Sequence, residues 1–192
     1  MKLISILTMA ALLASPAAFA NWVLSKDESK ITFSSTKKEN VVEVHTFEEF
    51  AGQVLKDGRA TIDINLASAQ TNIEIRNERL DTLLFDVSKF SGARVKGNVD
   101  VAKTNALAVG QSYTETLKLT LHLHGIHKEV SINVKVTKKS ANKVQVLSVE
   151  PLLIKAGDYG LAEGVEALRK VANLSSISLD VPVTFDLLFT KK

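Results

Sequence analysis

The chain has 192 residues, 45% of them hydrophobic, no cysteine and a formal net charge of +3. The lack of cysteine excludes disulfides, thiolate catalysis, iron–sulfur clusters and cysteine-ligated zinc. Acidic and basic residues are interspersed, and the basic runs are no longer than the Thr-Lys-Lys at 36–38, 137–139 and 190–192. A nucleic-acid partner is therefore not expected, because such proteins show clustered basic patches.

Residues 1–20 have the pattern of a secretory signal peptide. One lysine precedes a short apolar run, and Ala18-Phe19-Ala20 is a small-x-small cleavage sequence. The apolar run is too short to span a bilayer, and no later run reaches spanning length. The mature chain is expected to begin at Asn21 and to form one exported domain, residues 21–192, that is not integral to a membrane.

Alternation of apolar and polar residues dominates the rest of the chain. It is typical of strands with one face in the core and the other in water. About eight antiparallel strands in one domain favour a sandwich or a barrel, and the length of the segment 177–189 favours a barrel. The alternating segments are 60–66, 117–123, 130–136 and 177–187, with shorter ones at 31–33, 99–101 and 144–146.

Two segments have helical spacing instead. The first, 71–87, is expected to begin at a Thr71 cap. The second, 158–173, is expected to begin at an Asp158 cap and to end near Asn173. Both patterns predict amphipathic helices that lie over the sheet or close an opening in it.

Three of the four histidines, His122, His124 and His127, lie within six residues. In a strand, His122 and His124 occupy the face opposite to the leucines at 117–123, and His127 follows in the turn. All three are therefore expected on a solvated surface. A metal site that also includes His45 is the less favoured alternative, because a tight site requires three or four convergent ligands.

Charged residues are concentrated on the first predicted helix, at Arg76, Glu78, Arg79 and Asp81. An acid–base group or an anion clamp is one interpretation, and salt bridges on a solvated helix are the commoner one. The chain contains no phosphate-binding loop, dinucleotide-binding glycine motif, H-E-x-x-H or G-x-S-x-G sequence. Catalysis is not indicated, and neither a cofactor nor a metal is expected.

Four segments, in the same order, resemble YceI-like proteins. They are the mature start at Trp22, the F-x-x-x-x-G-x-V segment at 47–54, the strand, threonine and helix at 62–86, and the hairpin at 119–136. Together they extend over almost the whole mature chain. Family members often have a proline after the phenylalanine that follows the helix, and this chain has Ser91 there, which affects one turn.

The resemblance implies an all-β protein, a lipocalin-like eight-stranded antiparallel β-barrel with one or two short amphipathic helices. It also implies a periplasmic protein of a Gram-negative bacterium that binds a long isoprenoid or similar lipid, such as a prenyl phosphate, a ubiquinone-type quinone or a fatty amide. An apolar barrel suits that role, because burying each CH₂ contributes about 0.8 kcal/mol. A barrel of this size can equally be filled by its own side chains.

The inward-facing positions predict the lining of such a cavity. Arg76 or Arg79 is expected to meet a phosphate or quinone oxygen at its mouth. The predicted lining is Phe33, Phe47, Phe50, Ile62, Ile64, Leu119, Leu121, Leu123, Val181 and Phe185 from strands, with Leu80, Leu83, Leu84 and Phe85 from the first helix.

The sequence leaves other functions open. They are a ligand-free structural or stress-response protein, an enzyme that acts on an apolar small molecule through Arg76, Glu78 or a histidine, and an outer-membrane barrel. The charged end of the chain, an aromatic content of 6% and the lack of aromatic girdles argue against the membrane barrel. No residue decides whether an exposed edge strand pairs two copies into a homodimer.

Overall fold

The computed structural model describes residues 20–192. The expected signal peptide, apart from Ala20, lies outside this range, so its cleavage stays a prediction. Eight of the twelve strands form a closed antiparallel ring, because β1 pairs with both β4 and β12. The predicted eight-stranded barrel is therefore confirmed. The ring consists of β1 (Ala20–Leu24), β4 (Phe50–Leu55), β5 (Arg59–Asn65), β7 (Gly92–Asn98), β8 (Ser112–Leu123), β9 (Ile126–Ser140), β10 (Lys143–Ser148) and β12 (Asp180–Lys191).

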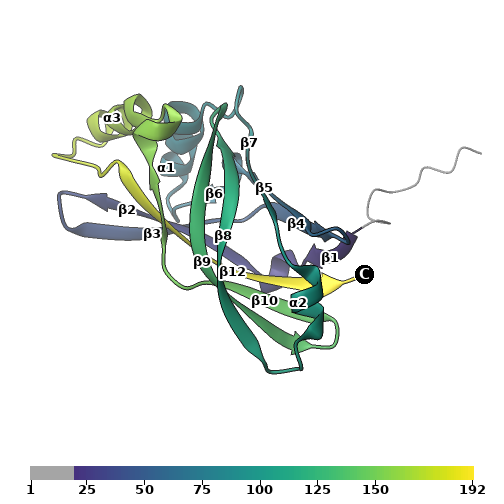
Figure 1. Ribbon diagram of the computed structural model, residues 1–192. Coiled ribbons are helices and arrows are strands. Elements are labelled where there is room, and N and C mark those ends of the chain that lie inside the picture. Colours follow the sequence, from purple (N-terminus) through teal and green to yellow (C-terminus); the bar gives the residue numbers. More distant parts are fainter. Residues whose placement is uncertain (1–19) are drawn as a thin grey trace, which may run out of the picture.

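Strand β12 extends beyond the closed ring and carries further strands. Its C-terminal half pairs with β1 and β10, whereas its N-terminal half pairs with β2 (Lys30–Lys37) and β11 (Leu152–Lys155). Strand β2 forms a hairpin with β3 (Val41–Phe47), which also pairs with the short β6 (Ala69–Gln70). Figure 1 shows this hairpin projecting from one end of the barrel.

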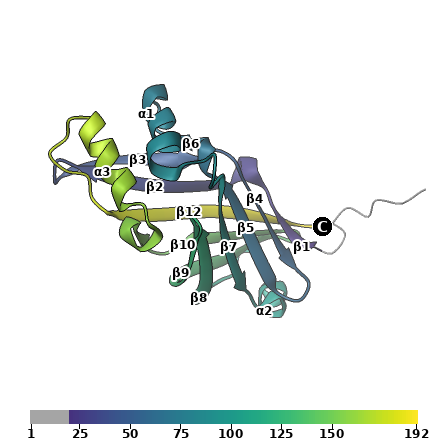
Figure 2. The ribbon, with the colours of Figure 1, turned by 90° about the horizontal axis from the view of Figure 1, so that it is seen from above.

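Three short α-helices lie near the two ends of the barrel. Helix α1 (Glu74–Arg79) continues into a π-helix (Leu80–Phe85), which packs against α3 (Ala162–Val171) at the end where the β2–β3 hairpin projects (Figures 1 and 2). Helix α2 (Val101–Ala106) lies at the other end. We call these the hairpin end and the α2 end. Within residues 20–192, no helix has the length and apolar character needed to cross a membrane.

The two predicted helices are present, but both predicted caps are wrong. Helix α1 begins after Ile73, whose carbonyl accepts a hydrogen bond from the Thr71 hydroxyl at 3.1 Å. Asp158 lies in a 3-10 turn before α3 and forms an ion pair with Lys128 at 3.0 Å. Each helix therefore starts later than its cap-like residue suggests. The second helix ends near Asn173 as predicted, and this residue has the left-handed conformation common at helix ends.

The predicted strand at 99–101 is a third error. Strand β7 ends at Asn98, and the side chain of Asp100 accepts a hydrogen bond from the backbone N–H of Lys103 at 2.8 Å. That bond caps the first turn of α2. Two valines separated by one residue fit the alternation of a strand, but three residues are too few to distinguish the period of a strand from that of a helix.

The interior contains two hydrophobic clusters, one toward each end. The cluster at the α2 end includes Trp22, Val134 and Leu187 and packs the closed ring tightly. The cluster at the hairpin end includes Phe85 and Leu161 and lies beneath the π-helix and α3. The first cluster forms the floor of the barrel and leaves only a small cavity, and the second surrounds the larger cavity described below.

Candidate functional site

An internal cavity of about 400 Å³ lies at the hairpin end of the barrel. Strands β2, β3, β5, β7, β8, β11 and β12 supply most of its wall, and the π-helix and α3 cover it. Of its 35 lining residues, 8 are polar and the others are hydrophobic. Small-molecule sites in proteins typically have this size and this mainly apolar lining. The larger hollow of the barrel therefore lies at the hairpin end, and the α2 end holds only a smaller one.

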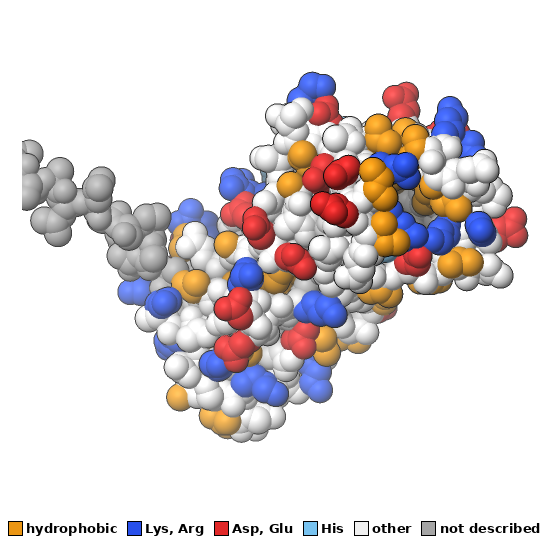
Figure 3. Space-filling view, turned by 180° about the vertical axis from the view of Figure 1, so that it is seen from behind, with side chains coloured by type: hydrophobic (Ala, Val, Ile, Leu, Met, Phe, Trp, Pro, Cys, Tyr) orange, Lys and Arg blue, Asp and Glu red, His pale blue; other side chains and the backbone are white. Residues whose placement is uncertain are grey.

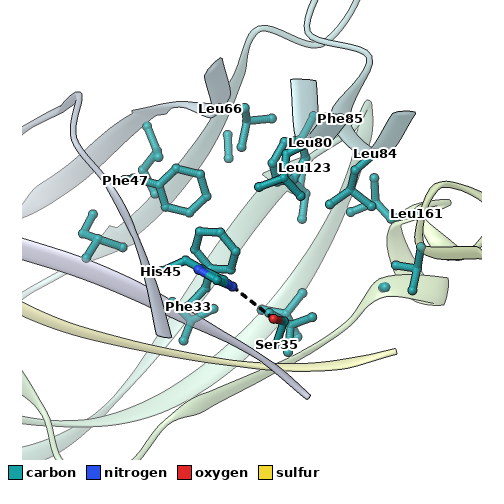
Figure 4. Close-up of a pocket in the computed structure, with 18 of the residues that line it drawn as sticks. Phe33, Ser35, His45, Phe47, Leu66, Leu80, Leu84, Phe85, Leu123 and Leu161 are labelled. Carbon is teal, nitrogen blue, oxygen red and sulfur yellow. Dashed lines mark hydrogen bonds between the residues drawn. The ribbon is translucent and has the colours of Figure 1, made fainter. Parts of the chain in front are cut away.

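Twelve of the fourteen hydrophobic residues proposed from the pattern lie in this wall, and their role in binding a ligand stays a prediction. Figure 4 shows several of them, including Phe33 and Phe47 from the hairpin and Leu123 from β8, around the cavity. The twelve are Phe33, Phe47, Ile62, Ile64, Leu80, Leu84, Phe85, Leu119, Leu121, Leu123, Val181 and Phe185.

Leu83 lies outside the cavity wall and is 37% exposed. The reason is the π-helix, in which a backbone N–H donates to the carbonyl five residues earlier. Residues four and five apart then share a face, so Leu84 and Phe85 lie beside Leu80. An α-helix would have placed residues three and four apart on that face, and Leu83 with them. The prediction for Leu83 is therefore corrected.

Phe50 is also outside the wall of this cavity. It is 8% exposed and packs with Trp22 and Leu187 in the cluster at the α2 end. Phe47, at the end of β3, lines the cavity. After Phe47 the chain leaves the projecting hairpin and enters the closed ring, where β4 begins with Phe50. Phe50 points inward as predicted, but it does so on β4, within the packed floor.

Helix α3 supplies lining residues that the pattern assigned to a helix but not to a cavity. Leu161, Val165 and Leu168 face the cavity from the segment that forms α3 and its N-cap. A side chain at Gly164 would place its Cβ 2.6 Å from the carbonyl oxygen of Leu83. The absence of a side chain at Gly164 therefore lets α3 lie directly on the π-helix, so that the two together form one lid.

The β2–β3 hairpin carries a polarity gradient along the cavity. Side chains that point inward are apolar where the hairpin joins the barrel and become polar toward its tip. Alternation along each strand fixes this arrangement, because every second residue faces the same side. On β2 the inward residues are Ile31, Phe33, Ser35 and Lys37, and on β3 they are Phe47, His45 and Glu43.

Charged groups meet at the polar end of the gradient. The Glu43 carboxylate accepts hydrogen bonds from Lys37 Nζ at 2.7 Å and from Arg76 Nη1 at 3.1 Å. Mainly because of the Lys37 ammonium, the pKa of Glu43 lies below its usual value. All three side chains keep solvent exposure, between 19% and 37%. This end of the cavity is therefore a mouth, and Figure 3 shows a hollow bordered by basic and hydrophobic side chains at the hairpin end of the molecule.

Arg79 also lines the cavity, and it differs from Arg76 in its contacts. Within residues 20–192, no carboxylate lies within 4.0 Å of its guanidinium, whereas Arg76 is held by Glu43. The other two charged residues of the predicted group point elsewhere. Glu78 is exposed, and Asp81 is partly buried, which raises the pKa of its carboxyl group. The structure thus brings the two arginines to the cavity without the two acids.

His45 is the buried polar residue in the middle of the gradient. It is 6% exposed and lies beside Phe33, with ring centroids 5.2 Å apart, and its Nε2 lies 3.0 Å from Ser35 Oγ (Figure 4). Its Nδ1 has no hydrogen-bond partner among the described residues. Burial lowers the pKa of the His45 imidazole, which is therefore neutral at neutral pH. The sequence pattern did not single out Ser35, and it considered His45 only as a metal ligand.

The other three histidines lie away from this cavity. His122 and His127 face each other across β8 and β9, with ring centroids 5.3 Å apart. His124 does not share the exposed strand face, because the turn begins at His124 itself, where φ is 50°. Its ring packs on Phe90, and its Nδ1 lies 3.2 Å from the Tyr159 carbonyl oxygen. Among residues 20–192, no group of three histidine or acidic side chains is placed to hold a metal ion.

The YceI-like domain matches residues 22–189 of this sequence. The chain belongs to the YceI-like family. A polyisoprenoid-binding domain from Saccharophagus degradans, implicated in plant cell wall breakdown, is 37% identical, with a TM-score of 0.88 over 90% of this chain and 99% of that one. No curated protein matches the chain.

Two further solved structures share the fold at lower identity. BcnA from Burkholderia cenocepacia is 20% identical, with a TM-score of 0.67 over 86% of this chain and 98% of that one. The YceI protein from Campylobacter jejuni is 14% identical, with a TM-score of 0.57 over 77% of this chain and 84% of that one. The closed YceI-like barrel is thus retained while most of the side chains differ.

The buried histidine gives this YceI-like barrel a predictable response to acid. The pKa of His45 in the folded chain lies below its ordinary value of 6.5, so the unfolded chain binds the proton more readily. Stability is therefore lost as the pH falls through about 6.5 toward the lower folded-state pKa. Replacing His45→Gln, which keeps a hydrogen-bonding partner for Ser35, is expected to reduce this loss. Urea unfolding at about pH 7.5 and about pH 5 measures it.

The control for this prediction is His127→Gln on the exposed hairpin. Its stability is expected to fall between the two pH values as much as that of the wild type. If His45→Gln lost as much stability on acidification as these two proteins, the buried neutral state of His45 would be refuted.

Proposed function

We propose that this protein binds one amphiphilic lipid with a long isoprenoid or similar apolar tail, and carries or stores it in the periplasm. The observation that carries the proposal is the polarity gradient, which places charged side chains at one end of a mainly apolar cavity. An amphiphile has the same asymmetry. The pattern of a signal peptide at residues 1–20 supports the periplasmic location.

The tail is proposed to lie among the hydrophobic side chains of the wall. Each buried CH₂ contributes about 0.8 kcal/mol, so a chain of many carbons binds tightly without any directional contact. The phenylalanines at 33, 47, 85 and 185 supply much of this surface. The 37%-identical relative is a polyisoprenoid-binding domain, and its likeness over almost the whole domain supports an isoprenoid as the tail.

The polar head is proposed to lie at the mouth, near Arg76 and Arg79. Because Glu43 already binds Lys37 and Arg76, the guanidinium of Arg79 is the more available donor for a phosphate or a quinone oxygen. A guanidinium presents several N–H groups in a plane, which suits both kinds of oxygen. A prenyl phosphate, a ubiquinone-type quinone and a fatty amide all fit this description.

We assign no catalytic role to the cavity. Ser35 and His45 are within hydrogen-bond distance, as a nucleophile and its base would be. However, in such sites a third group orients the imidazole, and His45 Nδ1 has no acidic partner in the described part of the chain. The pair is better explained as the middle step of the gradient. A ligand-free structural role is the alternative, and the open cavity disfavours it.

A homodimer also stays a prediction. Between Val41 and His45, strand β3 pairs with β2 only, so its other edge has no strand partner within residues 20–192. Val42 and Val44 on its outer face are exposed. An edge of this kind is suited to pairing with a second copy.

Native mass spectrometry of the protein purified from its source compartment, followed by organic extraction, tests the proposed function. A bound mass that the solvent removes, and that corresponds to an isoprenoid or another long-chain lipid, is expected. The variant Val181→Trp, which places a large ring in the wall, is expected to carry much less of that mass. Leu153→Trp, at an exposed position of β11, is the control. An unliganded mass together with no uptake of added farnesol or solanesol would contradict the proposal.

Arg79→Gln tests the head-group assignment. The variant is expected to bind farnesyl phosphate roughly tenfold more weakly, about 1.4 kcal/mol, and to bind farnesol as the wild type does, because farnesol has no anionic head. Titration calorimetry measures both. Arg94→Gln is the matched control, since Arg94 lies on the outer surface with Asp63. An equal loss for the alcohol and the phosphate would show that Arg79 acts on the shape of the cavity rather than on the charge of the ligand.

A further inference from the structure

A second, smaller cavity of about 100 Å³ lies toward the α2 end of the barrel. Its lining is mainly hydrophobic and includes Trp22, Leu117 and Val146. At its far side the Tyr113 hydroxyl hydrogen-bonds Thr104 of α2 at 2.9 Å. This cavity therefore lies on the side of the barrel away from the charged mouth.

Three side chains separate the two cavities, because they line both. They are Ile62 on β5, Val95 on β7 and Leu119 on β8. Ile62 and Val95 are direct partners in neighbouring strands, and Leu119 lies on the next strand. The two neighbours of Leu119 on the same strand face each line one cavity only. Leu121 lines only the main cavity and Leu117 only the second. We call Ile62, Val95 and Leu119 the partition.

Two glycines leave space beside the partition. Gly97 pairs with Leu119 across β7 and β8, and a Cβ at Gly97 would overlap the Leu119 Cδ2 atom. Gly52 pairs with Ile62 across β4 and β5, and a Cβ there would lie 3.3 Å from Ile62 Cγ1. Leu119 and Ile62 thus lean over positions that have no side chain. These side chains fill the space that the two glycines leave, so no side chain at the paired positions holds them in place.

We propose that the second cavity is a subsite for the end of the lipid tail, and that Leu119 limits the tail length. In the conformation seen here the partition closes the main cavity, so a short tail ends against it. A longer tail reaches the second cavity by displacing the Leu119 side chain from its place over Gly97. This inference rests on the proposed function, because it requires a ligand whose head stays at the mouth.

The direction of the tail follows from the gradient. The head is held near Arg79 at the hairpin end, so the tail can only extend toward the α2 end. The partition is the first barrier on that path, because its residues are the ones that the two cavities share. Beyond it the second cavity is small and ends near the Thr104–Tyr113 pair, so it has room for only the last part of a chain.

Three of the four leucines of β8 provide a matched test. The probes are prenyl alcohols of increasing length, geraniol, farnesol, geranylgeraniol and solanesol, and affinities are measured by titration calorimetry. Leu119→Ala joins the two cavities. We expect it to raise the affinity for the longest alcohol that the wild type binds, relative to the affinity for farnesol, by roughly tenfold, because a few additional carbons are buried. Leu117→Ala and Leu121→Ala each enlarge one cavity only, and are expected to change this preference much less.

The reverse change is Ala60→Leu, at a position that lines only the second cavity. It is expected to weaken binding of the longest bound alcohol several-fold relative to the wild type and to leave binding of farnesol unchanged. This variant therefore tests the inference even if Leu119→Ala fails to fold. Unchanged length preference in both variants would overturn the subsite while leaving the proposed function intact. If the wild type bound none of the four alcohols, the proposed function itself would fail.

Discussion

The antiparallel pairing of β12 along both of its edges is the interaction on which the rest of the structure depends. Near its C-terminus the strand closes the ring between β1 and β10. Near its N-terminus the same strand supports the β2–β3 hairpin and β11. One continuous strand thus joins a tightly packed floor to a hollow end. Since strand pairing fixes which side chains point inward, it also fixes the cavity wall on this side, from Phe185 to Val181.

The chain has no disulfide, so the packed end must stabilise the open one. Val134 and Leu187 are almost fully buried in the floor, and each such side chain contributes roughly 1.5–3 kcal/mol. The cavity lacks these contacts. A protein whose interior were wholly filled would be more stable, but it would have no space for a lipid tail. The division of the barrel into a mostly filled half and an open half is what allows one domain both to fold and to bind.

The period-two pattern predicted the barrel and most of the cavity wall, because alternation determines directly which face of a strand is buried. It failed where backbone geometry departs from a regular element. The π-helix displaced Leu83, and the early turn removed His124 from its strand. The polarity gradient could not be seen in the sequence either, because it depends on the pairing of two strands. Strand pairing places Phe33 opposite His45 and Ser35 opposite Glu43. Only this pairing shows that Ser35 and His45 lie between the apolar and the charged parts of the cavity wall.

The central claim is that a lipid tail occupies the cavity at the hairpin end, and NMR tests it most directly. Protein labelled at its leucine and valine methyl groups is mixed with unlabelled farnesol, and intermolecular NOEs are recorded. NOEs are expected from the tail to Leu84, Leu121 and Val181, and none to the exposed Leu153 and Val149. NOEs confined to exposed methyl groups, or none at a saturating concentration of the alcohol, would contradict it.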